Sequence, residues 1–408
     1  MPTDDVRRPA VNAIDFEAMT VDPYPTYRRL RAEAPVAWLP QLGGWALTRW
    51  QECEQVGLDE TTWAKENPAG AEGIIAQVTD RVVGLRNVLN VDGPDHFDLR
   101  AGMDPKLEGR EVLRYVDDLV QPIARRYASA IARLGRADLT ASYFSPVSVE
   151  ALGAVMGLSD LVDAETLVRW FNALSQGQQA LSLEPGLFET VDKVNAEIDD
   201  VVRPLLGRLR TAPDDSLLSH MVHAGRQGAE LRTDEELLPS IRVLLTGGMQ
   251  EPGHGAASTL LGLLLNPGQL AEVIDDLELV PAAVHEGLRW MAPIGFTERY
   301  ASTDQELAGV RIPAGDMVMI FLASANRDET RYADPDSFDI RRARGANQAF
   351  GHGRHLCAGN FFGRHVERIM LEELLSVVPS VRPDPGSPPQ VTGWGFRAPK
   401  KLNVVWDA

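Results

Sequence analysis

Cysteine is scarce in this sequence, where Cys53 and Cys357 are the only two among 408 residues. They lie about three hundred positions apart, so disulfide bonds are not expected to hold the fold together. So few cysteines in a chain of this size are typical of a reducing compartment.

Long hydrophobic runs are missing as well. The longest, at residues 260–265, is far shorter than the ~20 apolar residues that a membrane-spanning helix needs. The first residues are polar and contain no apolar segment typical of a signal peptide. These absences predict a cytoplasmic protein without a membrane anchor.

Positive charge is in deficit. The 40 Lys and Arg residues face 58 Asp and Glu residues, which gives a formal net charge of −18. Proteins that bind nucleic acid neutralise phosphates with clustered cations, so a general nucleic-acid binder is not expected.

Internal repeats, low-complexity tracts and long Gly/Ser or Pro linkers are also absent. A length of 408 residues exceeds the ~250–300 at which single cores usually split into domains. Without a linker that could separate two halves, we nevertheless expect one large compact unit.

Apolar residues recur mostly at spacings of three and four, which predicts helices, and a few short runs predict strands. The predicted helices cover residues 25–34, 112–134, 146–156, 164–181, 190–209, 217–223, 234–265, 267–277, 280–290 and 360–378. The predicted strands cover residues 36–39, 45–48, 298–301, 317–321 and 402–406. The fold should therefore be mainly α with a minor β-sheet region.

The most informative motif is Phe-Gly-His-Gly-Arg-His-Leu-Cys-Ala-Gly at residues 350–359. Its glycines allow a tight turn and a close approach to a ligand. Cys357 lies just before a helix that should begin near Asn360. A helix N-terminus lowers the pKa of a nearby thiol, and a thiolate can bind haem iron.

This motif resembles the haem-binding signature of cytochromes P450, Phe-Gly-x-Gly-x-His-x-Cys-x-Gly, at every fixed position. The resemblance runs from about Asp22 to the C-terminus. It implies an N-terminal extension at residues 1–21 and a single large P450 domain at residues 22–408. It also implies haem b as cofactor, with Cys357 as the axial iron ligand and His355 as a contact of a haem propionate.

Other matches follow in the order that the family shows. Glu286 and Arg289 resemble the Glu-x-x-Arg motif, whose two charges pair across one helix face and have a structural role. Arg299 matches the family's propionate-binding arginine. His96 and Arg100, four residues apart on a helix that opens after Asp-Gly-Pro, match the other propionate contacts.

The central helix departs from the family pattern. Gln250 stands where an acid is usual and Glu251 where an alcohol is usual, and Gly247, Gly248 and Pro252 flank them. The glycines and the proline predict a kink. Burial would raise the pKa of Glu251 and let it deliver protons, which makes Glu251, Gln250 and Gly247 candidate catalytic residues. A solvated Glu251 beside a mere bend remains the alternative.

Residues 248–255 are similar to a bacterial P450 subfamily that removes O-methyl groups from lignin-derived methoxyphenols such as guaiacol, as are residues 393–397. This implies a methoxylated substrate that yields a phenol or catechol and formaldehyde. The chain departs from that subfamily before His96 and around Gln178, so the specific phenol stays open. Candidate pocket residues are Val83, Leu89, Val243, Gly247, Ile294, Phe296, Thr297 and Phe396.

Neither a Rossmann fingerprint nor a four-cysteine cluster is present, so electrons from NAD(P)H must come through a separate protein. Residues 341–368 are basic, and their arginines have only Glu367 as an acidic neighbour in sequence. These arginines are Arg341, Arg342, Arg344, Arg354, Arg364 and Arg368. They predict a docking patch for an acidic iron–sulfur or flavin reductase or a ferredoxin, with a solvated basic helix end as the alternative.

Two other activities stay open. One is a P450 that hydroxylates another substrate, such as a terpenoid or secondary metabolite. The other is a peroxide-driven haem peroxygenase that uses Glu251 as its acid–base group. A non-catalytic haem sensor is disfavoured, because the glycine pair of the central helix leaves room for a ligand.

Overall fold

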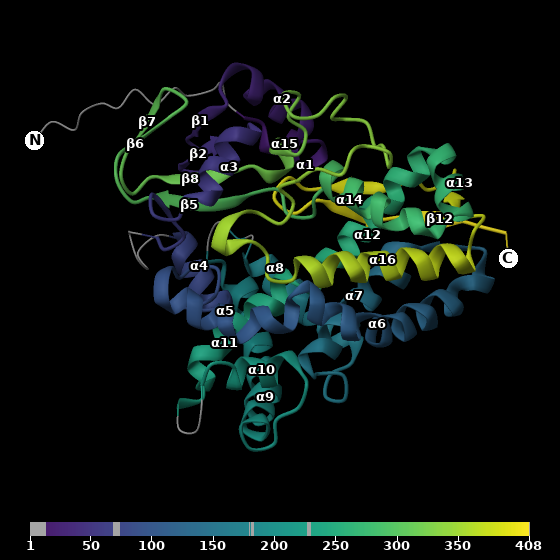
Figure 1. Ribbon diagram of the computed structural model, residues 1–408, viewed down its shortest axis with the longest axis horizontal. Coiled ribbons are helices and arrows are strands. Elements are labelled where there is room, and N and C mark those ends of the chain that lie inside the picture. Colours follow the sequence, from purple (N-terminus) through teal and green to yellow (C-terminus); the bar gives the residue numbers. More distant parts are fainter. Residues whose placement is uncertain (1–13, 68–73, 179, 181–182, 227–229, 408) are drawn as a thin grey trace, which may run out of the picture.

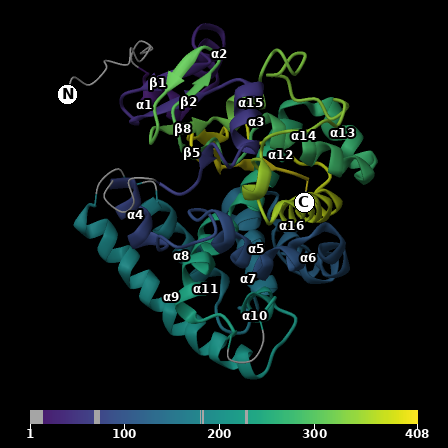
Figure 2. The ribbon, with the colours of Figure 1, turned by 60° about the vertical axis from the view of Figure 1, so that its left-hand side comes forward.

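The computed structural model describes residues 14–67, 74–178, 180, 183–226 and 230–407. Helices dominate, as predicted. Figure 1 shows the largest sheet and the helices α1–α3 and α15 gathered at one side, with the long helices on the other. Figure 2 shows the same division from another direction.

The helical elements follow the chain in this order: α1 Phe16–Val21, α2 Tyr24–Glu33, α3 Trp50–Leu58, α4 Ile74–Val82, α5 Gly93–Leu107, α6 Gly109–Ile131, α7 Ser145–Met156, α8 Ala164–Gln178, α9 Pro185–Thr211, α10 Leu217–His223, α11 Asp234–Gly247, α12 Glu251–Leu265, α13 Pro267–Asp275, α14 Val280–Trp290, α15 Leu322–Ala325 and α16 Asn360–Val377. Short 3-10 or π turns lie at Ala132–Leu134, Thr140–Phe144, Leu277–Leu279 and Gly353–His355.

The strands are β1 Val36–Leu39, β2 Gly44–Leu47, β3 Trp63–Ala64, β4 Arg136–Asp138, β5 Thr297–Ala301, β6 Gln305–Leu307, β7 Val310–Ile312, β8 Met317–Ile320, β9 Arg382–Pro383, β10 Gln390–Thr392, β11 Ala398–Lys401 and β12 Asn403–Val405. The largest sheet has five strands in the order β1-β2-β8-β5-β3. Only β2 and β8 are parallel in it; β3 runs antiparallel to β5, with Trp63 opposite Ala301 and Ala64 opposite Tyr300.

The helical core forms because long helices bury one apolar stripe each. On α6 the residues Val112, Val116, Val120, Ala124 and Ala128 repeat every four positions and are all fully buried. The helix α6 packs against α16. The helix α12 packs against both α14 and α16. The helix that follows the cysteine motif is thereby fixed between two long neighbours.

The helix predicted over residues 234–265 is in fact two helices, α11 and α12, separated by a bend at residues 248–250. Pro252 lies in the first turn of α12, where a missing N–H costs nothing. Ser148 of α7 closes the gap, since its hydroxyl donates to the Met249 carbonyl (2.5 Å) and accepts from the Gly253 N–H (3.1 Å). The predicted kink is confirmed, and it amounts to a full interruption.

Other predicted boundaries agree within a few residues, and of α5 only the start was predicted. The sequence did not predict α1, α3, α4, α15, β3, β4, β6, β7, β9, β10 and β11. The buried face of α5 includes His96 and Gly102, so its apolar residues do not form the usual stripe. Part of the predicted helix 164–181 lies outside the described residues, as do residues 1–13.

The domain boundary predicted after residue 21 does not coincide with a break in packing. Phe16 of α1 contacts the ring of Trp394, and the Thr20 carbonyl accepts a hydrogen bond from the Gly393 N–H (2.7 Å). Among the described residues, no helix is both long and apolar enough to cross a bilayer.

Candidate functional site

The cysteine loop is held in a tight, non-helical shape by glycine. Gly351 and Gly353 have φ values of 72° and 65°, in the left-handed region that favours glycine. The Cys357 N–H donates to the Phe350 carbonyl (3.0 Å), and the Cys357 carbonyl accepts from the Asn360 side chain (2.8 Å). The loop thus delivers Cys357 to the start of α16, as the motif predicted.

Cys357 combines an exposed residue with a closely surrounded sulfur atom. It is exposed to solvent, yet protein surrounds the sulfur closely enough that burial raises the pKa of its thiol. The Gly359 N–H, Arg100 and Arg364 oppose this effect without overcoming it. The predicted net lowering by the helix N-terminus is therefore wrong, because desolvation outweighs it. A bound metal cation would deprotonate such a thiol.

A cluster of unpartnered nitrogen atoms lies beside the loop. The rings of His96 and His355 stack with centroids 4.0 Å apart. The Nε2 atom of His96, the Nδ1 atom of His355 and the Nε atom of Arg299 are all buried without a hydrogen-bond partner. Buried polar atoms are rarely left unpaired in proteins. Arg299 Nε and, in the matching tautomer, His96 Nε2 can donate to an anionic ligand, whereas His355 Nδ1 donates only when its ring is doubly protonated, because Nε2 faces Asp92.

The charges of this cluster lead to the same conclusion. Burial and the neighbouring His355 and Arg100 lower the pKa of His96 to about 4. Burial also lowers the pKa of Arg299, with Glu298, Asp92 and Glu60 acting against it. Bringing carboxylates next to these groups would relieve the cost of burying them. A thiol near the Arg299 guanidinium and two histidines with unpaired, buried nitrogen atoms fits haem, which carries an iron atom and two carboxylates.

Arg100 contacts the loop itself. Its guanidinium pairs with Asp104 (2.5 Å) and donates to the carbonyls of Arg354 (3.0 Å) and Leu356 (2.9 Å). It therefore ties α5 to the cysteine loop, and it does not belong to the unpartnered set. Its predicted contact with a propionate stays a prediction.

Glu251 begins α12 close to Cys357, near enough to influence its pKa. Both carboxylate oxygens are buried and have no hydrogen-bond partner. Burial raises the pKa of Glu251 to about 7, partly offset by backbone N–H groups and Lys400. The predicted rise in the pKa of Glu251 is confirmed. The alternative, a solvated Glu251, is wrong because both carboxylate oxygens are buried. Gln250 is also buried with an unpartnered Oε1, and Gly247 opens onto free space, where an added Cβ would meet no atom within 4 Å.

Comparisons with known proteins decide the family. Residues 271–393 match the family model for cytochrome P450. The cytochrome P450 monooxygenase PikC of Streptomyces venezuelae is 30% identical over 405 residues, which are 96% of this chain and 92% of that protein. The chain belongs to the cytochrome P450 family.

Two further comparisons agree. The mycinamicin IV hydroxylase/epoxidase of Micromonospora griseorubida is 31% identical over 329 residues, 78% of this chain and 79% of that protein. The crystal structure of CalO2 superposes with a TM-score of 0.85 at 25% identity, covering 97% of this chain and 99% of that one. As a P450, the protein is a haem-thiolate monooxygenase that uses dioxygen and takes electrons from a separate reductase.

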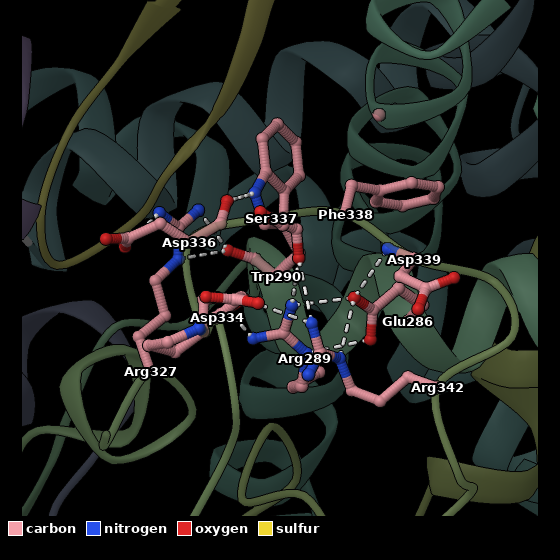
Figure 3. A network of polar contacts seen from close by, with 12 residues as sticks. Glu286, Arg289, Trp290, Arg327, Asp334, Asp336, Ser337, Phe338, Asp339 and Arg342 are labelled. Atoms are coloured by element: carbon pink, nitrogen blue, oxygen red, sulfur yellow. Dashed lines mark hydrogen bonds and ion pairs between the residues drawn. The ribbon is translucent and has the colours of Figure 1, made fainter.

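The Glu-x-x-Arg pair of this P450 lies at the centre of a buried network (Figure 3). Arg289 forms a bidentate ion pair with Glu286, with N–O distances of 2.7 and 2.8 Å, and both are 2% exposed. Arg289 also donates to the carbonyls of Asn326, Pro335 and Ser337, and Glu286 accepts from the Asp339 N–H. The pair joins α14 to the segment that leads into the cysteine loop, which is the predicted structural role.

The candidate pocket residues fall into two groups. Leu89 and Gly247 are exposed, Val243 is 7% exposed, and Ile294, Thr297 and Phe396 are half-buried, with Ile294 and Phe396 joined by a β-bridge. Val83 is only 1% exposed inside the helical core, so it has almost no surface for a substrate. The Phe296 ring stacks on Trp394 at 5.3 Å and packs against Phe321. We therefore remove Val83 from the pocket, whereas Phe296, which is half-buried like Ile294 and Thr297, stays a prediction.

The arginines of residues 341–368 have more acidic neighbours in space than in sequence. Acids outside this segment pair with four of them: Arg341 with Glu272, Arg342 with Glu286, Arg354 with Glu60, and Arg368 with Asp117 and Glu372. Arg364 lies over the ring of Phe350. The sequence could not reveal these pairs, because every acid except Glu372 comes from a distant segment. The basic patch is therefore weaker than predicted.

Sequence reasoning missed two residues of the site. Asp92 accepts from the backbone N–H groups of Lys65 (2.8 Å) and Glu66 (2.9 Å) and contacts His355 Nε2 at 3.0 Å. It therefore links the end of β3 to the cysteine loop. Lys65 is buried and contacts β5. The sequence contains only a weak indication of Asp92, which precedes the predicted start of a helix. It contains no indication that Lys65 belongs to the site.

Proposed function

We propose that this P450 removes the O-methyl group of a small, guaiacol-like methoxylated aromatic to give a phenol or catechol. The methoxyarene, dioxygen, two electrons and two protons yield the phenol, formaldehyde and water. The observation that carries the proposal is the buried, unpartnered carboxyl of Glu251 near Cys357. It occurs within residues 248–255, whose sequence is similar to that of guaiacol O-demethylases.

In this proposal Cys357 would hold the haem iron through its sulfur. His96, His355 and Arg299 bind the haem carboxylates, because their free nitrogen atoms are buried without partners. Arg100 acts as a positioning residue through its bonds to the carbonyls of the cysteine loop. Haem, held by these residues, would supply the dioxygen chemistry, with electrons from the reductase.

Glu251 is the proposed proton donor. A pKa of about 7 means that a large share of the molecules hold a proton on this carboxyl at neutral pH and can release it there. Gln250 cannot supply a proton, but its buried Oε1 can hold a water molecule in place. Gly247 leaves the space that dioxygen and a substrate need.

The pocket residues that we retain support a small arene. Leu89, Val243, Ile294 and Phe396 are apolar, which suits an aromatic ring, and Thr297 offers one hydroxyl. The β-bridge between Ile294 and Phe396 holds the turn between β10 and β11 beside the residues that precede β5.

A second candidate is hydroxylation of a larger secondary metabolite. A relative at 31% identity is named for hydroxylation and epoxidation of mycinamicin IV. A spectral titration with methoxyphenols, methoxybenzoates and mycinamicin IV separates the two. The proposal expects substrate-induced spectral shifts with the methoxyarenes and one formaldehyde per turnover; saturation by mycinamicin IV alone would overturn it.

Replacing Glu251 by Gln should slow turnover by about 10²- to 10⁴-fold, which is the usual contribution of a general acid. The Glu251→Gln variant keeps the shape of the side chain but has no proton to give. In the parent, turnover should fall as the pH rises through about 7, because the protonated form is lost there. Initial rates of formaldehyde release between pH 5.5 and 9 would measure both effects.

The Glu251→Asp variant serves as the matched control and should keep much of the activity with a similar fall at high pH. Substrate binding, followed by spectral titration, should change little in either variant. A Glu251→Gln variant with parental turnover would contradict the assignment. Fast turnover with hydrogen peroxide alone, without reductase, would instead support the peroxygenase alternative.

We further infer that the reductase docks over the cysteine loop. Three large apolar residues are exposed around it: Phe97 of α5, Leu356 next to the cysteine, and Phe361 in the first turn of α16. The Arg354 guanidinium covers the Phe97 ring at 4.5 Å, and exposed Arg344 adds a second cation in the preceding segment. An apolar centre with cations near it suits an acidic iron–sulfur partner.

Replacing Arg344 and Arg354 by Gln should raise the reductase concentration needed for half-maximal turnover several-fold at low salt, and less at high salt, because salt screens exposed charges. The matched control is Arg382→Gln, an exposed arginine paired with Asp407 near the C-terminus. Turnover measured at 20 and 500 mM NaCl gives the comparison. An effect that is absent, or equal at both salt concentrations, would exclude this surface.

A further inference from the structure

Lys65 is an unusual residue for its position, because lysine is rarely buried. Its side chain is 5% exposed. The ammonium contacts Glu298 Oε1 at 2.8 Å and donates to the Thr297 hydroxyl at 3.0 Å. An ammonium has three N–H donors, so within the described part of the chain one of them is left without a partner.

The strand pairing places this lysine beside a second cation. The ladder between β3 and β5 sets Ala64 opposite Tyr300, and the same register carried one residue further sets Lys65 opposite Arg299. Like charges directly opposite each other destabilise a sheet. The two cations are close enough that Arg299 lowers the pKa of Lys65, in addition to the larger effect of burial.

Hydrogen bonds to carboxylates do not saturate this pair of cations. Among the described residues, Glu298 is the only carboxylate in hydrogen-bond contact with the Lys65 ammonium, and the Arg299 guanidinium donates to the Glu298 carbonyl and keeps its Nε free. Asp92 is already occupied by His355 and by two backbone N–H groups. The charges of Lys65 and Arg299 also act on His355, whose ring lies against His96, and each of these two histidines has a buried nitrogen atom without a partner.

We propose that Lys65 is a further haem-binding residue, which offers its free N–H to a haem carboxylate alongside Arg299, His96 and His355. Glu298 competes with that carboxylate for the same ammonium, so the two acidic groups act on Lys65 in opposite directions. The inference rests on the proposed haem site but concerns a residue outside every family motif in the chain.

Haem transfer tests this without relying on turnover. The holoprotein is loaded with haem, or with haem whose two carboxylates are methyl esters, and mixed with excess apomyoglobin. Lys65→Met should speed the transfer of ordinary haem about tenfold, since a hydrogen bond to a charged group contributes ~1.5–3 kcal/mol. With the ester, which lacks the carboxylate charge, the variant and the parent should release their cofactor at nearly equal rates.

Two further variants sharpen the result. Lys65→Arg keeps the charge and should restore most of the retention, whereas Glu298→Gln removes the competitor and should slow haem transfer. Lys106→Met is the control, because Lys106 also pairs with an acid, Glu111, at a different place. Equal acceleration with haem and its ester would mean that Lys65 only supports the fold and would overturn the inference, as would unchanged haem transfer. A parent that binds haem with a thiolate spectrum while Lys65→Met has no effect would overturn this inference alone.

Discussion

A Cys357→Ala variant is expected to lose the absorption band that marks thiolate ligation in the reduced, carbon monoxide-bound protein, and with it all reductase-driven turnover. No other cysteine can substitute, because Cys53 is buried in the cluster below the sheet and donates to the Leu47 carbonyl. Cys357, in contrast, is exposed. Visible spectra of the reduced protein under carbon monoxide would measure the loss.

Cys53→Ala is the matched control for this variant. It removes the other thiol of the chain and should keep the thiolate band, with a modest loss of stability from the buried cavity it leaves. If Cys357→Ala retained the band or the turnover, the assignment of the iron ligand and every role derived from it would be wrong.

Breaking the Glu286–Arg289 pair should have the largest effect on folding. Arg289→Met leaves Glu286 and three main-chain carbonyls buried without their main donor. Removing one partner of a buried ion pair typically costs about 3–5 kcal/mol, which approaches the whole stability of many domains. We expect a variant that purifies without haem or unfolds at much lower urea concentration.

The exposed pair Glu111–Arg114 provides the comparison. It has the same i,i+3 spacing with an N–O distance of 3.2 Å, but the Arg114 side chain is 76% exposed. Arg114→Met should change the unfolding free energy by less than about 0.5 kcal/mol. Similar urea midpoints for the two variants would show that the buried network does not hold the segment before the cysteine loop.

The parts of the site that lie close together in sequence could be predicted. The cysteine loop is a local pattern of glycines and one thiol, so the sequence of residues 350–359 was enough to predict it. Glu286 and Arg289 share one helix face, and the raised pKa of Glu251 followed from its place in an apolar helix. The long helices were predictable because each carries a regular apolar stripe, as α6 does.

The parts that depend on distant segments could not be predicted. Lys65 joins the site only because β3 pairs with β5, and a strand of two residues leaves no periodic signal. The arginines after residue 340 looked unpaired because their partners, such as Glu272 and Asp117, come from other helices. The side-chain direction of Phe296 follows from its stack on Trp394, about a hundred residues away in sequence.

The glycines of α12 have a consequence for how this enzyme can change over evolutionary time. A methyl group at Gly253 would meet the Phe144 carbonyl at 2.8 Å, and one at Gly255 or Gly262 would collide with Glu367 or Phe338. At Gly247, across the bend, the same methyl would touch nothing. Substitutions at these glycines of α12 would thus cost stability, whereas a small side chain at position 247 would not clash with the fold. If the proposed site is right, such a side chain would take up space assigned to dioxygen and substrate, so a change at position 247 would alter function while the scaffold is inherited unchanged.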